Sequence, residues 1–204
     1  MIVAKSEEGK VITIDGPAGS GKSTTAKLVA RELDFLYLDT GALYRAIAVL
    51  ALDKGIPLED GSSLAALARA ADLNVRLSDG NQRVSSGSVD LTPRIRAAEI
   101  DAAVSPVSAV PEVRAAMLSL QRAQRRPPGL VAEGRDLGTV VFPDADLKIF
   151  MVADLPVRAH RRVIERNAMG ESADEQAEMQ ALARRDQLDS SRPVAPLSRP
   201  RDAA

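Results

Sequence analysis

The sequence predicts an α/β fold in which a parallel sheet is flanked by helices. Two short apolar runs, Val11–Ile14 and Phe35–Leu38, are each followed by residues spaced as on one face of an amphipathic helix. Two further apolar runs, Leu130–Ala132 and Leu147–Val152, have the length of buried strands. Strands that alternate with helical patterns are typical of parallel sheets built from βαβ units.

Length and composition limit the classes of protein to consider. The 204 residues suffice for one domain with a sizeable core, and 45% hydrophobic with 27% charged residues is ordinary for a globular chain. A net charge of −1 gives no field suited to a nucleic acid polymer or an anionic membrane. The chain has no cysteine, no signal-peptide pattern and no membrane-length apolar run, so we expect a cytoplasmic protein without thiol chemistry.

The first predicted unit is a strand, a glycine-rich loop and a helix. The strand at Val11–Ile14 is short and rich in β-branched residues, as buried parallel strands are. The helix after the loop is marked at i, i+3, i+4 and i+7 by Ala26, Val29, Ala30 and Leu33. The second unit repeats this order, with a strand at Phe35–Leu38 and a helix marked by Leu43, Ile47 and Leu50.

The regular alternation breaks between about residues 55 and 91. A short helix there is marked by Leu64, Leu67, Ala68 and Ala71. Alternating Val75 and Leu77, a turn signal at Asp79-Gly80-Asn81, and then Val84 and Val89 predict a small antiparallel ribbon. We interpret this segment as an insert on the parallel core.

Helices and strands alternate again after the insert. Thr92-Pro93 is typical of a helix start, with a cap and a proline at the first helical position, and Pro111 marks a second start. The strands at Leu130–Ala132 and Leu147–Val152 follow. Two helices joined by the polar stretch NAMGESAD come next, and the proline-rich ending RPVAPLSRPRDAA is expected to be irregular.

The glycine-rich loop matches the phosphate-binding pattern G-x-x-x-x-G-K-[ST] at every fixed position. Glycines let the backbone fold tightly, so that consecutive N–H groups point at a triphosphate, and the following helix adds its positive end. We expect Lys22 to reach the β- and γ-phosphates and Ser23 to ligate Mg²⁺. The predicted ATP site consists of Gly16, Pro17, Ala18, Gly19, Ser20, Gly21, Lys22, Ser23 and Thr24.

The loop alone does not identify a reaction, because GTPases, ATP-driven machines and small-molecule kinases all use it. The chain has no N-K-x-D guanine motif and is short for an ATP-driven machine, which favours a kinase. Ligands of open parallel sheets bind at the carboxyl ends of the strands. Polar residues that follow predicted strands there are Thr40, Arg45, Glu133, Arg135 and Asp136.

Other candidates for the acceptor side come from helical segments. Ser105 and Arg114 lie between the insert and the third core strand, and Arg185, Asp189 and Arg192 are spaced at i, i+4 and i+7 on one helix face. A single arginine is more often a solvated surface side chain. The Arg185–Asp189 spacing is equally consistent with an intrahelical salt bridge.

Five stretches together resemble bacterial cytidylate kinases, which belong to the nucleoside monophosphate kinases of the P-loop class. They are GPAGSGKST, YLDTGALYRA, AEGRDLGTVVFPDADLKIF, RAHRR and RRDQLDSSRPVAPL. The similarity runs from about Val11 to Leu197. It implies a P-loop NTPase-type parallel sheet flanked by helices, a small antiparallel insert in the region that binds the monophosphate, and a helical lid.

The resemblance also implies an activity and roles for single residues. The activity is transfer of a phosphoryl group from ATP, bound with Mg²⁺, to CMP and dCMP. Catalytic roles fall to Lys22, Arg135, Arg161 and Arg162, with Arg158 at the start of the lid. Arg45, Arg114 and Arg135 bind the CMP phosphate; Thr40, Ser105, Arg114 and Asp136 surround the cytosine; and Arg185, Asp189 and Arg192 serve the ribose and base. Glu133 holds Mg²⁺ through water, beside Ser23.

The same resemblance divides the chain as a single kinase domain over residues 1–204. The core comprises residues 10–54, 92–157 and 175–197, the monophosphate-binding insert about 55–91, and the lid about 158–174. The family usually continues with another strand and a C-terminal helix, which we expect this chain to lack. We expect a monomer that binds ATP, CMP and dCMP but no nucleic acid polymer and no membrane.

Two alternatives remain open from the sequence. One is a P-loop kinase for a non-nucleotide acceptor such as shikimate or dephospho-coenzyme A, and the other is a truncated chain that binds nucleotide with little turnover. A phosphate acceptor has a second pKa of about 6 and is largely a dianion at neutral pH, so it needs no general base. We therefore expect the single histidine, His160, to be structural or at the surface.

Overall fold

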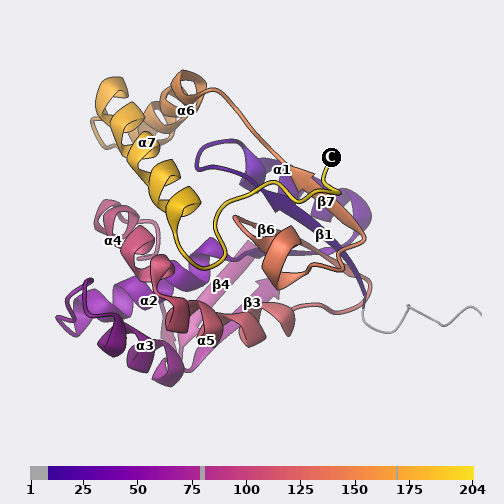
Figure 1. The fold of residues 1–204 in the computed structure, drawn as a ribbon, viewed down its shortest axis with the longest axis horizontal. Helices are drawn as coiled ribbons and strands as arrows, with labels where there is room; N and C mark the ends of the chain where they lie inside the picture. The colour runs from indigo at the N-terminus through magenta and orange to yellow at the C-terminus, as the bar shows by residue number, and fades with distance from the viewer. Residues whose placement is uncertain (1–8, 79–80, 169) are drawn as a thin grey trace, which may run out of the picture.

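The computed structural model describes residues 9–78, 81–168 and 170–204. Its main sheet has four parallel strands in the order β2-β6-β1-β7 (Figure 1). The strands are β1 (Lys10–Asp15), β2 (Leu36–Asp39), β6 (Gly129–Gly134) and β7 (Leu147–Phe150). The predicted α/β fold with a parallel sheet is therefore confirmed.

Helices cover the sheet because its central strands are apolar on both faces. Ile12 and Ile14 of β1 pack with Ala26 and Ala30 of α1 (Lys22–Leu33) on one face. On the other face, Val11 packs with residues of β2, β6 and the segment after β6, among them Leu38, Leu130 and Leu137. All six residues of β6 are buried, as expected for a strand between two neighbours.

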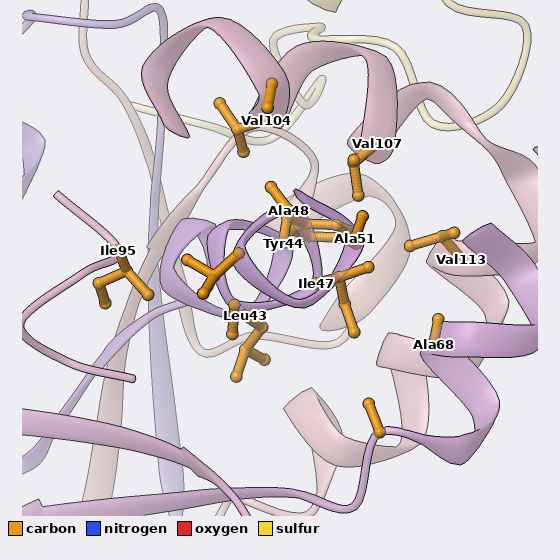
Figure 2. Close-up of a cluster of buried hydrophobic side chains, with 14 of the residues drawn as sticks. Leu43, Tyr44, Ile47, Ala48, Ala51, Ala68, Ile95, Val104, Val107 and Val113 are labelled. Carbon is orange, nitrogen blue, oxygen red and sulfur yellow. The ribbon is translucent and has the colours of Figure 1, made fainter. Parts of the chain in front are cut away.

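A helical arm contains the largest apolar cluster, which surrounds α2 (Figure 2). Alanine, leucine, isoleucine and valine occupy nearly every turn of this helix, so it can be buried on several sides. The four helices of the arm are α2 (Gly41–Asp53), α3 (Gly61–Ala70), α4 (Ala98–Ala109) and α5 (Pro111–Arg122). Of the two predicted helix starts, the one at Pro111 is confirmed, because α5 begins at this residue.

The predicted helix start at Thr92-Pro93 is wrong, because these residues form a turn and α4 begins at Ala98. The Thr92 hydroxyl does not cap a helix. It accepts a hydrogen bond from the Val84 N–H at 3.0 Å, while the Thr92 N–H donates to the Asp90 carboxylate at 2.9 Å. Both local contacts fasten the end of the insert, and they leave no free hydroxyl for a helix.

The insert forms a second, antiparallel sheet of β3 (Leu73–Ser78), β4 (Asn81–Ser86) and β5 (Val89–Asp90). The predicted ribbon is confirmed, and of its turn signal Asp79 and Gly80 lie outside the described residues. The Gln82 amide joins this sheet to the end of β2. It accepts from the Asp39 N–H at 2.7 Å and donates to the Asp39 carbonyl at 3.0 Å.

Two antiparallel neighbours, α6 (Leu155–Ala168) and α7 (Glu175–Ser191), lie above the carboxyl ends of the core strands (Figure 1). The Asp174 side chain caps α7 by accepting the Ala177 N–H at 2.8 Å. The chain then returns to the main sheet, where Ala204 makes two backbone hydrogen bonds, each 3.0 Å, with Lys148 and Phe150 of β7. None of the helices described is long and apolar enough to cross a membrane.

A buried carboxylate at the end of β1 organises the segment after β6. Asp15 is 1% exposed, and its two oxygens accept the N–H groups of Leu137 and Gly138 at 2.9 and 2.8 Å. These residues open a single π-helical turn, η1 (Leu137–Val141), directly after Asp136. Burial raises the pKa of Asp15 to about 6, and the two N–H groups oppose this shift.

Replacing Asp15 with asparagine should destabilise the protein by about 1–3 kcal/mol, because the amide NH₂ would face a backbone donor that then lacks an acceptor. The measurement is chemical unfolding at pH 7.5. Glu59→Gln, at an exposed position, is the matched control and should stay within about 0.5 kcal/mol of wild type. Equal unfolding midpoints for the two variants would contradict this role of Asp15.

Candidate active site

A cavity of about 880 Å³ opens at the carboxyl ends of the core strands, between the glycine-rich loop, the helical arm and the α6–α7 pair. Basic side chains outnumber acidic ones in its lining. The basic residues are Lys22, Lys27, Arg45, Arg96, Arg114, Arg135, Arg161, Arg162, Arg185 and Arg192. The acidic residues are Asp39, Glu133, Asp136, Glu165 and Asp189. Such a lining suits ligands that carry several negative charges.

The glycine-rich loop has the compact backbone that its sequence predicts. Gly16, Gly19 and Gly21 all have positive φ, at 149°, 73° and 97°. A Cβ at Gly16 would lie 2.1 Å from the Met151 carbonyl oxygen, so only glycine fits there. Because the loop leads directly into α1, the helix N-terminus and its free N–H groups face the cavity.

Lys22 lies at the base of this loop and is 5% exposed. Its ammonium group donates to the Pro17 carbonyl at 2.7 Å and lies 3.5 Å from the Ser20 hydroxyl. Burial and the nearby Arg135 guanidinium lower the pKa of Lys22 to about 7, against the attraction of Glu133. A ligand phosphate would therefore stabilise the protonated form of this amine.

Oxygen donors suited to Mg²⁺ lie beside Lys22. The Glu133 carboxylate accepts the Tyr37 hydroxyl at 2.5 Å and a hydrogen bond from the Ser23 side chain. Burial, and then the Asp39 charge, raise the pKa of Glu133. The described residues contain no cluster of three or more His, Cys, Asp or Glu that could enclose a metal by themselves. One hydroxyl and one carboxylate nevertheless fit Mg²⁺, which keeps several waters and takes phosphate oxygens from its nucleotide.

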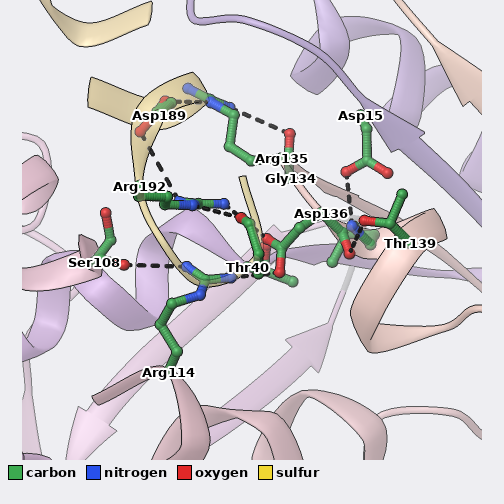
Figure 3. Close-up of polar contacts among 12 residues, drawn as sticks. Asp15, Thr40, Ser108, Arg114, Gly134, Arg135, Asp136, Thr139, Asp189 and Arg192 are labelled. Carbon is green, nitrogen blue, oxygen red and sulfur yellow. Dashed lines mark hydrogen bonds and ion pairs between the residues drawn. The ribbon is translucent and has the colours of Figure 1, made fainter. Parts of the chain in front are cut away.

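A buried network of arginines and aspartates forms the opposite side of the cavity (Figure 3). The Asp136 carboxylate accepts from Arg114 and, at 3.3 Å, from Arg192. The Arg135 Nε donates to Asp189 at 2.8 Å. All of these charged side chains are at most 17% exposed. Buried ion pairs with this connectivity hold the guanidinium planes in fixed orientations.

Arg185 is the exception in this network, because its Nε is buried without a hydrogen-bond partner. Burial and then the Arg135 charge lower the pKa of Arg185 to about 10. The sequence left open an intrahelical pair between Arg185 and Asp189. In the structure Asp189 pairs at 2.8 Å with Arg135 of a different segment, and Arg192 of its own helix face lies 4.0 Å from it. A guanidinium at a cavity wall whose Nε lacks a hydrogen-bond partner is a ready binding group for an anion.

Most of the predicted site residues line this one cavity. These are Ala18, Gly19, Ser20, Gly21, Lys22, Ser23, Thr24, Thr40, Arg45, Arg114, Glu133, Arg135, Asp136, Arg161, Arg162, Arg185, Asp189 and Arg192. Gly16 and Pro17 belong to the loop but are not part of the cavity lining. Ser105 is buried but is not part of the lining, which Val104 and Ser108 of the same helix enter. His160 has a side chain 63% exposed, as expected for a surface residue.

Arg158 lies beneath the glycine-rich loop rather than in the cavity. It donates to the Ala18 carbonyl at 3.0 Å and to the Ala153 carbonyl at 2.9 Å, and it pairs with Asp186 at 2.7 Å. This side chain therefore ties α6 and α7 to the loop. Arg161, one turn further along α6, lines the cavity and donates to the Ser20 carbonyl at 3.5 Å.

Several residues in and around this site were not predicted from the sequence. Arg96 lines the cavity and pairs with Asp39 at 2.6 Å, and the Tyr44 ring lies 5.3 Å beneath the Arg114 guanidinium. Asp101 pairs with Arg45 of the helical arm and Arg162 of α6. Asp101 stands four residues before Ser105 in a helical segment, and this spacing was the available signal.

A P-loop that faces a fixed cluster of guanidinium groups across one cavity defines a kinase with two anionic substrates. The family model described as cytidylate kinase matches residues 12–204. The chain is 46% identical over 192 residues to a cytidylate kinase of Exiguobacterium sp., covering 94% of this chain and 86% of the relative. A Pelotomaculum thermopropionicum cytidylate kinase is 46% identical over 193 residues (94% and 85%), and a Pseudomonas aeruginosa one 45% over 195 (95% and 85%). The chain belongs to the cytidylate kinase family.

Proposed function

We propose that this protein transfers the γ-phosphoryl group of ATP to CMP and dCMP. The observation that carries the proposal is the pairing, in one cavity, of a P-loop with a buried arginine cluster on the opposite wall. Relatives at about 45% identity over nearly the whole chain bear the name cytidylate kinase. The position of the second cluster makes a phosphate-bearing acceptor the best match to the cavity.

On the donor side, the loop from Gly16 to Thr24 binds the ATP phosphates through its N–H groups and through Lys22. Ser23 would hold Mg²⁺ directly and Glu133 would hold it through water. When bound, the ion neutralises phosphate charge. The lid arginines, Arg161 and Arg162, lie on α6 at the rim of the cavity and are placed to contact the transferring group.

On the acceptor side, we assign the CMP phosphate to Arg45, Arg114 and Arg135, with the unsatisfied Arg185 nearby. The cytosine would lie against Thr40 and Asp136, and Asp189 with Arg192 would bind the ribose or the base edge; Ser105, predicted beside the cytosine, lies outside the cavity lining. Thr40 is held in place by its hydroxyl, which donates to the Glu133 carbonyl at 2.8 Å. Asp136 is held by two guanidinium groups and by the η1 turn that Asp15 fixes.

The main barrier to this reaction is the electrostatic repulsion between the two phosphate groups, not the removal of a proton from the acceptor. Two unit negative charges about 4 Å apart repel by about 4 kcal/mol at an effective dielectric near 20. The arginines of the acceptor wall and Lys22 of the donor wall offset this repulsion and align the attacking and leaving oxygens. The acceptor phosphate is largely a dianion at neutral pH, so the site needs no general base.

The test is ADP formation with ATP, Mg²⁺ and a panel of acceptors. We expect rapid turnover with CMP and dCMP, and at least about tenfold lower kcat/KM with AMP and GMP. Shikimate and dephospho-coenzyme A should give no more ADP than water alone. If another acceptor gives a higher kcat/KM than CMP and dCMP, the proposed function is wrong and that acceptor is the substrate. Nucleotide binding without any product would identify a chain that binds but does not turn over.

A further inference from the structure

Asp101 lies where the helical arm meets the lid helix. It stands on α4, its side chain is 15% exposed, and each of its two oxygens faces a different element. Oδ1 accepts from Arg45 Nη2 of α2 at 2.5 Å. Oδ2 pairs with Arg162 of α6, and Arg166 Nη2 of the same helix lies 3.6 Å from it. One carboxylate therefore joins α2, α4 and α6.

Asp101 is the shared ion-pair partner of Arg45, Arg162 and Arg166, and its negative charge offsets the repulsion among their positive charges. Burial opposes ionisation of Asp101, but Arg45 and Arg162 more than offset this and leave its pKa below the usual value. Arg45 is fixed further by a bond of 3.1 Å from its Nη1 to the Ile95 carbonyl. Its two terminal nitrogens thus both bind the protein, Nη1 through Ile95 and Nη2 through Asp101.

The geometry points to Asp101 as a positioning residue that sets the acceptor-side arginine and docks the lid with the same carboxylate. The inference rests on the proposed function, which places Arg45 at the acceptor phosphate and Arg162 at the transferring group. Asp101 itself does not line the cavity and does not touch the reacting atoms. It acts through these two side chains, both of which do line the cavity.

Replacing Asp101 with asparagine removes the negative charge and keeps the size of the side chain. The variant therefore distinguishes the two ion pairs of Asp101 from its packing. Asparagine has the shape of aspartate but carries an NH₂ group in place of one oxygen, so in Asp101→Asn either Arg45 or Arg162 faces a donor instead of an acceptor. The unpaired arginine would then turn away from its neighbours, because like charges repel at this distance. Glu99→Gln is the matched control, since Glu99 is an exposed acidic residue on the same helix.

The first experiment is steady-state kinetics with CMP and ATP. We expect Asp101→Asn to lower kcat about tenfold or more and to raise KM for CMP several-fold, while KM for ATP changes less than about twofold. Glu99→Gln should match wild type in all three constants. A purely structural role would lower the amount of folded enzyme without this split between the two substrates.

The second experiment measures the docking of the lid without any reaction. The chain has no cysteine, so spin labels attach only where cysteines are introduced. Ala98→Cys on α4 and Asn167→Cys on α6 change exposed residues at the two elements that Asp101 joins. We expect one narrow distance distribution in the otherwise wild-type chain and with Glu99→Gln, and a broader, longer one with Asp101→Asn.

Parallel results for Asp101→Asn and Glu99→Gln in both experiments would overturn the inference. Slower catalysis with an unchanged label distance would also overturn it, because the lid would then dock without Asp101. If the wild-type protein forms no ADP in response to CMP, the proposed function is wrong, and the contact between Asp101 and α6 then has no role in that reaction. The label distances distinguish these failures, since they require no substrate.

Discussion

Replacing Lys22 with methionine is expected to lower kcat for CMP phosphorylation by about a thousandfold or more. Methionine keeps the length and apolar stem of the side chain but removes the ammonium group that lies at the base of the P-loop. The negative charge that accumulates on the bridging oxygen of ATP would then lack its partner on the donor side. Steady-state assays at saturating ATP and CMP measure the loss.

Lys54→Met is the control, because Lys54 is exposed at the end of α2. It should leave kcat unchanged. CMP affinity, measured by calorimetry without ATP, should be within about twofold of wild type in the Lys22→Met variant, since the acceptor wall remains. An enzyme that keeps a tenth or more of its turnover without Lys22 would contradict the assigned role.

The same substitution tests the ionisation of Lys22. Because its pKa is lowered to about 7 in the free protein, the amine is largely neutral at pH 8. A triphosphate would raise that pKa, so ATP binding at pH 8 should take up a proton, and ATP affinity should fall as pH rises above about 7. Calorimetry in two buffers of different ionisation enthalpy measures the uptake. It should disappear with Lys22→Met, and equal uptake in both proteins would refute the assignment.

Replacing Asp136 with asparagine is expected to lower kcat/KM for CMP by about a hundredfold to a thousandfold. The carboxylate bonds Arg114 and Arg192 at once, and an amide keeps only one acceptor oxygen for these two buried guanidinium groups. The assigned contact with cytosine would be lost in the same step. Because the donor wall is unchanged, KM for ATP should change less than about twofold.

Asp34→Asn is the control for this substitution. Asp34 is exposed and has a φ of 55°, a conformation that asparagine tolerates. Its kcat/KM for CMP should equal that of wild type. Thermal unfolding of both variants shows whether the protein remains folded. Comparable CMP turnover in folded Asp136→Asn and Asp34→Asn proteins would remove Asp136 from the substrate site.

The sequence predicted the core and the glycine-rich loop because both depend on local patterns. The P-loop pattern lies between one strand and one helix, and the observed loop joins β1 to α1. Arg45 and Arg135 were predicted from their positions after strands, since parallel strands end at the same edge of a sheet. Both line the cavity. The alternation in the insert likewise predicted a small antiparallel ribbon, which the structure shows as a three-stranded sheet.

Contacts between distant segments could not be predicted in the same way. Helical spacing suggested Arg185 as a partner of Asp189, but tertiary structure brings Arg135 closer to that carboxylate. Asp101 had no motif of its own, and its importance depends on where α2 and α6 meet α4. The helix start at Thr92 was wrong because a threonine hydroxyl can serve a strand as well as a helix end.

The most direct test is a crystal structure of the protein with CMP and a non-hydrolysable ATP analogue bound together. We expect the triphosphate along the P-loop and the CMP phosphate between Arg45 and Arg135, directed at the γ-phosphate, with the cytosine against Asp136. A pyrimidine nucleotide bound anywhere else, or a CMP phosphate that contacts neither arginine, would contradict the account.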